Sequence, residues 1–204
     1  MDKLLDSIVN MFEGLNLWGW IGQISGLIGF VAILISFQCS KKKYCLIAGL
    51  SMILFIIEST TSIVSMANFS VCVISMIRNL WMYYKLKNNK GELTKVEVFS
   101  LIALMWVGQI IYMSITNSFL SLSSYFTVVT ATILTFLQNN KNYYIVKLGN
   151  LIQECGALAL FIICGMPFSI FRQIVLVSSV LISILIIFLR DRKYKAKNPE
   201  ENIK

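Results

Sequence analysis

The feature that most constrains this chain is a charge-free stretch near its N-terminus. No acidic or basic residue occurs between Glu13 and Lys41, and the segment Leu17–Phe37 is almost entirely apolar. A helix of that length is about 30 Å long, which matches the hydrocarbon core of a bilayer. Three consecutive lysines, 41–43, follow it. An apolar helix that is followed by three cations is typical of a transmembrane span whose basic end lies in the cytoplasm.

Composition extends this interpretation to nearly the whole chain. Hydrophobic residues make up 57% of the 204 residues and charged residues only 14%, which is unlike a soluble domain of this length. The net charge of +8 is spread in short basic clusters between apolar segments. This pattern favours a lipid bilayer with anionic headgroups as the partner of the basic residues, and it argues against nucleic acid.

The apolar segments predict an all-α membrane protein with seven transmembrane helices. The predicted spans are Leu17–Phe37, Tyr44–Ser65, Phe69–Tyr84, Val96–Ile115, Leu120–Leu137, Tyr143–Cys164 and Phe168–Leu189. Residues 1–16 predict an amphipathic helix at the membrane surface, and residues 190–204 a polar cytoplasmic tail.

The distribution of basic residues predicts the orientation. With seven spans, the loops after spans one, three and five lie on the same side as the C-terminal tail. That side holds 15 of the 18 lysines and arginines: Lys41, Lys42, Lys43, Lys85, Lys87, Lys90, Lys95, Lys141, Lys147, Arg190, Arg192, Lys193, Lys195, Lys197 and Lys204. The positive-inside rule therefore predicts a multi-pass membrane protein with its N-terminus outside and its C-terminus in the cytoplasm.

The spacing of loops and turns predicts an internal repeat. A shift of 99 residues places Phe37 on Phe136 and Tyr44 on Tyr143, and it superimposes both the basic loops and the outer turns. Residues 17–85 and 119–189 are therefore expected to be two three-helix units in the same orientation. The span 96–115 joins them, which gives a 3+1+3 arrangement.

These features resemble a known family of membrane proteins. The run Gly22–Phe37 ending in Ser36-Phe37-Gln38, the short basic turn, the pair Arg78-Asn79 and the 3+1+3 layout are similar to the YgjV-type bacterial inner-membrane family. That family is similar in architecture to the SWEET sugar transporters and the PnuC vitamin transporters. The resemblance implies a 3+1+3 helical fold and, by analogy, movement of a small sugar-like or vitamin-like solute.

Polar residues inside the spans define a candidate site. Three groups recur at helical spacing: Glu58 with the serines and threonines that follow it, Ser75 with Arg78 and Asn79, and Asn150 with Gln153 and Glu154. Such faces point away from lipid. The candidate residues for substrate binding or coupling are Arg78, Glu58, Glu154, Asn79, Gln153, Asn150 and Gln23.

Depth in the membrane decides which charges can meet. At about 1.5 Å per residue from the outer turns, Glu58 lies about 12 Å deep, Arg78 about 15 Å and Glu154 about 16 Å, whereas Arg172 lies only about 7 Å deep. An unpaired charge near the bilayer centre costs at least a few kcal/mol. We therefore expect Arg78 to pair with Glu58, Glu154 or both, and Arg172 to reach outward.

Two classes of function remain open on these residues. The buried charges either bind a small solute in a transporter, or only fix the fold of a non-transporting protein such as an immunity-type partner or a structural subunit. An enzyme is not expected, because the chain has no histidine and no HExxH or GxSxG motif. The sequence suggests no cofactor and no metal site, and it leaves the oligomeric state open.

The stripe Gly19, Gly22, Gly26 and Gly29 predicts close packing of the first span against another helix.

Overall fold

The computed structural model describes residues 17–60, 69–117, 122–163 and 167–197, and the described residues are almost entirely helical. They form seven helices: α2 (Leu17–Phe37), α3 (Lys41–Thr60), α5 (Phe69–Lys87), α6 (Lys95–Thr116), α7 (Leu122–Gln138), α8 (Tyr143–Ile163) and α9 (Pro167–Lys197). The all-α prediction is therefore confirmed. The predicted surface helix at residues 1–16 and the outer turns near residues 66–68, 116–118 and 165–167 lie wholly or partly outside the described residues.

Four helices of the described segments are long and apolar enough to cross a membrane. These are Leu17–Phe37, Lys41–Thr60, Lys95–Thr116 and the part of α9 from Ile170 to Arg190. Large apolar side chains such as Ile24, Leu27, Ile28 and Val31 cover the outer face of α2 and are exposed. An apolar outer surface of this kind is compatible with a multi-pass membrane protein, since lipid rather than water can solvate it.

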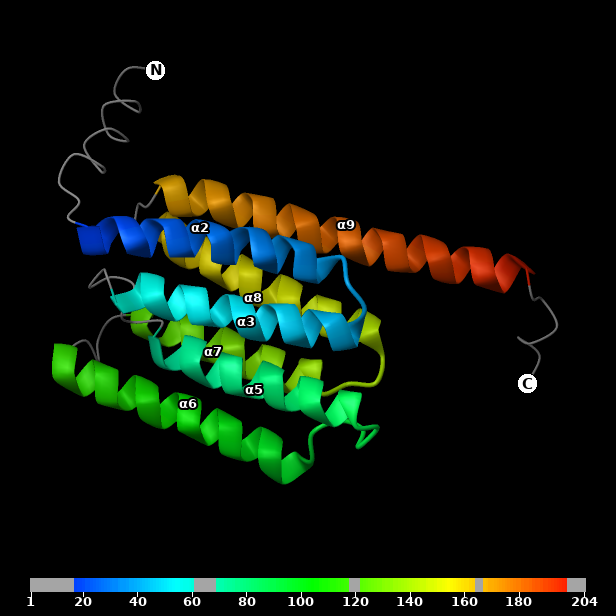
Figure 1. Ribbon diagram of the computed structural model, residues 1–204, viewed down its shortest axis with the longest axis horizontal. Helices are drawn as coiled ribbons and strands as arrows, with labels where there is room; N and C mark the ends of the chain where they lie inside the picture. The colour runs from blue at the N-terminus through cyan, green and yellow to red at the C-terminus, as the bar shows by residue number, and fades with distance from the viewer. Residues whose placement is uncertain (1–16, 61–68, 118–121, 164–166, 198–204) are drawn as a thin grey trace, which may run out of the picture.

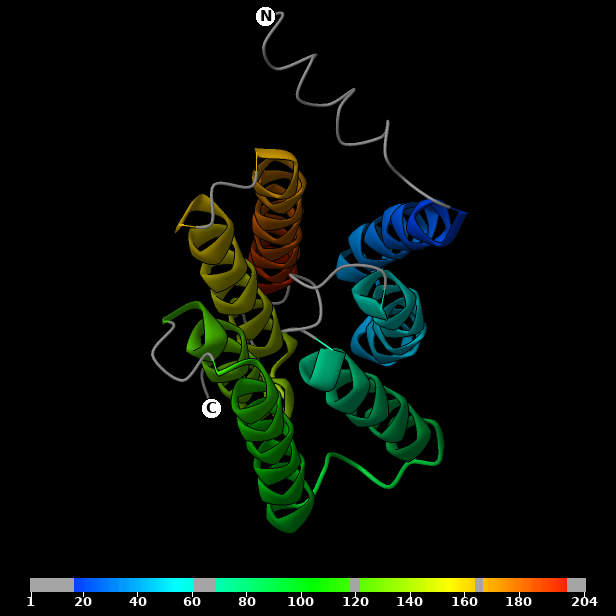
Figure 2. The ribbon, with the colours of Figure 1, turned by 90° about the vertical axis from the view of Figure 1, so that its left-hand side faces the viewer.

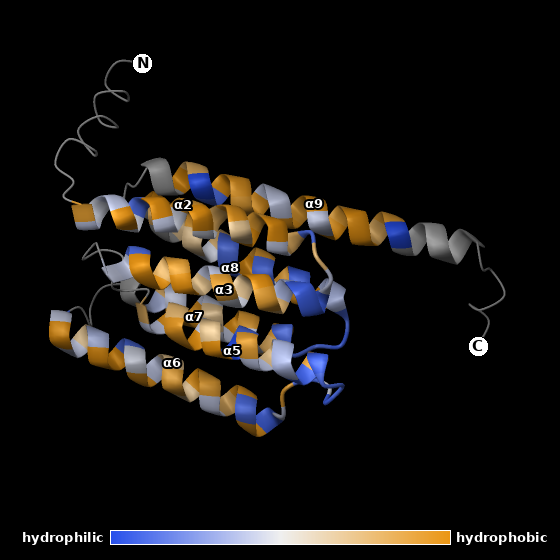
Figure 3. Cartoon of the chain, in the orientation of Figure 1, coloured by the Kyte–Doolittle hydropathy of each residue, from blue (hydrophilic) through white to orange (hydrophobic). Residues whose placement is uncertain are grey.

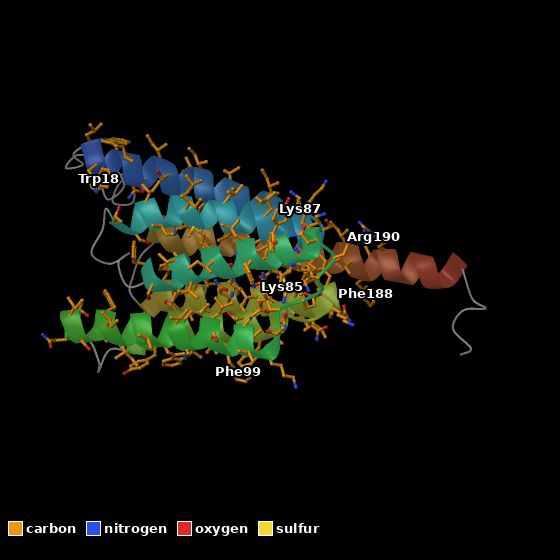
Figure 4. All side chains as sticks on the ribbon, turned by 60° about the horizontal axis from the view of Figure 1, so that its bottom comes forward. Trp18, Lys85, Lys87, Phe99, Phe188 and Arg190 are labelled. Carbon is orange, nitrogen blue, oxygen red and sulfur yellow. The ribbon has the colours of Figure 1, made fainter. Side chains whose placement is uncertain are left out.

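Successive helices run in opposite directions, so alternate connections lie at the same end of the bundle (Figure 1). The connections after α2, α5 and α7 share one end, and hydrophilic residues gather there (Figure 3). Lys85, Lys87 and Arg190 lie toward this end, whereas Trp18 lies at the other (Figure 4). We call the two ends the basic end and the opposite end. Helix α9 continues past its predicted end at Leu189 to Lys197.

The helices pack into two groups. Helix α3 packs against both α2 and α5, and α8 packs against both α7 and α9, while α6 contacts α5 and α7. Figure 2 shows α2, α3 and α5 on one side of the bundle and α7, α8 and α9 on the other. The groups meet where α2 contacts α9 and where α5 contacts α7.

The glycine stripe on α2 packs as predicted. Gly19, Gly22, Gly26 and Gly29 are all buried. A Cβ atom at Gly26 would lie 2.5 Å from the carboxyl carbon of Glu58, and one at Gly29 would lie 3.2 Å from Cβ of Leu54. Because glycine has no side chain, α2 can approach α3 closely enough for the Glu58 carboxylate to rest on its backbone.

Candidate functional site: a buried polar network around Arg78

Arg78 lies at the middle of α5 and joins the two helix groups. Its side chain is 2% exposed. The Nη1 atom donates to Oγ1 of Thr135 on α7 over 2.8 Å, while Nε and Nη2 both lie 3.4 Å from Oδ1 of Asn79. Arg78 is thus a buried cation held by neutral oxygens, as a polar face turned away from lipid would predict.

The expected pairing of Arg78 with Glu58 or Glu154 is wrong. Among the described residues, salt bridges join Lys41 to Glu92, Lys85 to Glu97, and Arg172 to Glu58. The Nη1 atom of Arg172 lies 3.0 Å from Oε1 of Glu58. Glu58 is two residues from the end of α3 at Thr60, and Arg172 is five residues from the start of α9 at Pro167. Both lie near the opposite end of the bundle, whereas Arg78 is nine residues from either end of α5, so Arg172 is the cation at the level of Glu58.

Further polar side chains extend the contacts of Arg78 across four helices. Nε2 of Gln138 donates to Oδ1 of Asn79 over 2.7 Å and lies 3.8 Å from Sγ of Cys45. The hydroxyl of Tyr44 donates to Oδ1 of Asn150 over 2.8 Å. Tyr44 and Cys45 both lie near the Arg78 guanidinium. We define the Arg78 network as Tyr44, Cys45, Arg78, Asn79, Thr135, Gln138 and Asn150, all of which are buried.

Several polar atoms in and beside this network are buried without a hydrogen-bond partner. They are Asn79 Nδ2, Gln138 Oε1, Asn150 Nδ2 and, one turn before Arg78 on α5, Ser75 Oγ. A buried polar atom that lacks a partner costs about 1–3 kcal/mol. Native proteins contain only a few such atoms, and each needs an explanation such as a bound molecule. Four of the seven such atoms among the described residues lie in or beside the Arg78 network, which makes this network the candidate site.

Glu154 and Gln153 lie next to the network on α8. The carboxylate of Glu154 accepts a hydrogen bond from Nε2 of Gln173 on α9, which also donates to the Glu154 backbone carbonyl over 3.0 Å. Oε1 of Gln153 is buried without a partner. Glu154 lies near Tyr44, so the predicted group on α8 does border the Arg78 network.

Gln23 does not belong to this site. It is exposed, whereas Gly22 and Gly26 on either side of it are buried. Gln23 lies one residue after Gly22, which rotates its side chain by about 100° from that glycine on a helix. The structure therefore does not bring Gln23 together with the other candidate residues, and its role in substrate binding stays a prediction.

Lys147 is a second buried cation, which the sequence analysis assigned to a loop. Its side chain is 0% exposed. The Nζ atom donates to the backbone carbonyl of Phe37 and lies 5.5 Å, 5.3 Å and 4.8 Å from the ring centroids of Phe37, Tyr44 and Tyr143. Aromatic faces attract cations, so these rings replace part of the lost hydration. The position of Lys147 one turn inside an apolar segment was the clue in the sequence.

At the basic end, many hydrogen bonds close the space between the helix groups. Residues 38–40 form the connection after α2, and Gln38, Cys39 and the first residue of α3, Lys41, bond to the other group. Lys41 donates to the carbonyl of Asn140 over 2.6 Å, Tyr143 donates to the carbonyl of Cys39 over 2.7 Å, and Gln38 bonds to Ser179 over 3.2 Å. This end is therefore closed by side chains from α2, α3, α8 and α9 and the connections between them.

At the opposite end, a different contact joins the groups. The Arg172–Glu58 pair links α9 to α3, and the Arg172 guanidinium lies 5.9 Å from the ring centroid of Phe55. The side chains of Arg172 and Glu58 are 20% and 18% exposed. In the described part of the chain, this end thus has one partly solvated ion pair, where the basic end has a set of exposed or partly buried hydrogen bonds.

Comparison of the chain with family models, with curated proteins and with solved structures finds no match.

Proposed function

We propose that this protein transports a small polar solute across a bacterial inner membrane and that the Arg78 network is its central site. In this proposal the chain crosses the bilayer seven times in a 3+1+3 arrangement, with α6 as the linker. The alternating helix directions and the two packed groups support the arrangement. The less apolar α5 and α8 contain Arg78 and Lys147, but both cations are buried in the bundle, so neither meets lipid.

The observation that carries the proposal is the group of buried polar atoms without hydrogen-bond partners around Arg78. Where a buried charge serves only to fix the fold, we expect it to have an oppositely charged partner and a complete set of hydrogen bonds. Each missing partner lowers the stability of the folded state. Here the guanidinium has neutral oxygens as its hydrogen-bond partners, and orphan polar atoms surround it. A solute that supplies hydrogen bonds to these atoms would stabilise the site.

The contacts that close the two ends of the bundle, here called the two closures, support alternating access to this site. Rocking of one helix group against the other opens the opposite end by breaking the Arg172–Glu58 pair. Opening of the basic end breaks the contacts of residues 38–41 with Asn140, Tyr143 and Ser179. The structure corresponds to a state in which both closures are formed and Arg78 is 2% exposed. With the basic end in the cytoplasm, the ion pair faces outward.

Uptake into proteoliposomes tests the proposal. Purified protein is reconstituted, and counterflow of a panel of radiolabelled small metabolites is measured against protein-free liposomes. We expect at least one polar solute to be taken up. Arg78→Gln should reduce its uptake by at least about tenfold, because a lost charged hydrogen bond of about 1.5–3 kcal/mol corresponds to a factor of roughly 10–150.

The exposed Lys87 on the same helix provides the matched control. Lys87→Gln removes one positive charge outside the network, and it should leave uptake within about twofold of the wild type. Unchanged uptake in well-folded Arg78→Gln protein would show that Arg78 only stabilises the fold. An absence of uptake for every polar solute would favour the non-transporting class.

A further inference from the structure

We infer that the Arg78 network binds a small hydroxylated carboxylate, with the carboxylate on Arg78. This inference rests on the proposed function and names the substrate class of the same site. It follows from the sign of the buried charge, from the balance of unused donors and acceptors, and from the position of the nearest acidic side chain.

The buried charge of the network is positive. Arg78 has no carboxylate among its hydrogen-bond partners or salt bridges in the described residues. Lys147 adds a second buried cation, with Nζ 5.3 Å from the ring centroid of Tyr44. In the described segments, neither cation forms a salt bridge with a carboxylate. Two such cations in a low-dielectric interior repel a cationic solute and attract an anion. A carboxylate supplies the missing charge and matches the planar fork of a guanidinium.

The unused hydrogen-bonding groups specify more than charge. The acceptors that Arg78 contacts are Thr135 Oγ1 and Asn79 Oδ1, so two of its five N–H groups remain for a ligand. Asn79 Nδ2 and Asn150 Nδ2 add unused donors. The orientation of the Asn79 amide is fixed because its Oδ1 accepts from Arg78, which can only donate. In the structure, Oδ1 of Asn150 accepts from the hydroxyl of Tyr44. These donors suit the two oxygens of a carboxylate.

The unused acceptors suit hydroxyl groups. Gln138 Oε1 and, on the neighbouring face of α8, Gln153 Oε1 are buried without a partner, and Ser75 Oγ can donate or accept. An anion without an O–H group, such as chloride or sulfate, offers no donor to these oxygens, whereas a solute hydroxyl does. Glu154 is the nearby acidic side chain, but its carboxylate is already bonded to Gln173. The ligand that would use all of these groups is therefore a molecule with one carboxylate and at least one hydroxyl group.

Ligand-dependent stabilisation of the purified full-length protein tests this inference without requiring transport. Thermal unfolding in detergent is followed by intrinsic tryptophan fluorescence with lactate or gluconate as the carboxylate probes. Lactamide and glucose are the neutral counterparts, propionate lacks the hydroxyl, and sodium chloride controls for ionic strength. At about one hundred times the Kd, we expect lactate or gluconate to raise the midpoint by roughly 5 °C, because a ligand that binds only the folded state stabilises it. The neutral probes and sodium chloride should give no shift, and propionate a smaller one.

Variants assign the effect to Arg78. Arg78→Gln should abolish the shift, Arg78→Lys should retain part of it, and Lys87→Gln should retain all of it. If Arg78→Gln does not fold, the comparison of lactate with lactamide and of gluconate with glucose in the wild type still decides the question. The inference is overturned if neither carboxylate shifts the wild type, if the neutral probes shift it equally, or if the shift persists in Arg78→Gln.

The outcome is separable from that of the proposed function. Arg78-dependent stabilisation by a carboxylate without uptake in proteoliposomes would retain the site and reject transport. Uptake of a neutral solute without any effect of the carboxylates would retain transport and reject this substrate class.

Discussion

Two arginines lie inside apolar helices of this chain, and their surroundings differ. Arg172 lies near the end of α9 and forms a partly exposed ion pair with Glu58. Arg78 lies in the middle of α5 and bonds to Thr135 and Asn79. The sequence predicted the burial of Arg78 and Asn79, since polar residues at helical spacing avoid lipid. It could not predict their partners, because the relative heights of Thr135, Glu58 and Arg172 depend on how the helices slide against one another.

Thr135 is the closest hydrogen-bond partner of Arg78, so its hydroxyl should matter for stability. Thr135→Val keeps the shape of the side chain but removes the oxygen that accepts from Nη1 over 2.8 Å. We expect the free energy of unfolding to fall by about 1.5–3 kcal/mol, because the lost hydrogen bond involves a charged group. Unfolding by sodium dodecyl sulfate in mixed micelles measures the change.

Thr130 on the same helix serves as the control for this substitution. Its hydroxyl donates only to carbonyls of its own helix, those of Phe126 and Thr127. Thr130→Val should therefore change the stability by less than about 1 kcal/mol, since only a local hydrogen bond is lost. Equal effects of the two substitutions would mean that the contact between Thr135 and Arg78 contributes little.

At the scale of helices, the opposite end depends on the contact between α2 and α3. Gly26 leaves room for the Glu58 carboxylate, which in turn reaches Arg172 on α9. The sequence predicted the close packing of the glycine stripe, because small residues three and four apart are typical of tight helix pairs. It could not predict that this stripe holds a carboxylate rather than an apolar side chain, because that depends on the rotation of α3.

Breaking the Arg172–Glu58 pair should expose the opposite end of the bundle. Cys72 on α5 bonds to Ser59 and lies near both Glu58 and Arg172, so it is a native reporter for this end. In a protein with Cys72 as its single cysteine, Arg172→Gln should increase labelling by a membrane-impermeant maleimide at least threefold. The rate of labelling is measured on sealed vesicles, with Lys87→Gln as the control. An unchanged rate would contradict the role of the pair as a closure.

Gly26→Ala should act through the same ion pair. The new Cβ would lie 2.5–2.7 Å from the Glu58 carboxyl atoms, so the carboxylate has to move away from it and from Arg172. We expect faster labelling of Cys72, as in Arg172→Gln. The double variant should label no faster than Arg172→Gln alone, since the pair is already broken. Additive effects would indicate that Gly26 acts on a different contact.

At the scale of the whole molecule, hydropathy and charge predicted the helices and the common end of the basic loops. The predicted starts near Phe69, Val96 and Tyr143 agree with α5, α6 and α8 within one residue. The constant shift of 99 residues is not found in the helix ends: α3 and α8 begin at Lys41 and Tyr143, whereas α5 and α9 begin at Phe69 and Pro167. The repeat therefore stays a prediction that depends on helix packing.

Lys147 was misassigned because charge counts do not show whether a lysine near a helix end faces water or a cage of aromatic rings.

The central claim is that the Arg78 network is reached from both sides of the membrane in turn. Native Cys45 reports on this directly, since it is 0% exposed and lies 3.8 Å from Nε2 of Gln138 within the network. The measurement is the modification of Cys45, as the single cysteine, by a small membrane-impermeant methanethiosulfonate applied to either face of sealed vesicles. The account predicts slow modification from both faces and protection by a bound solute. Modification from neither face, in protein whose Cys45 reacts fully after unfolding, would contradict it.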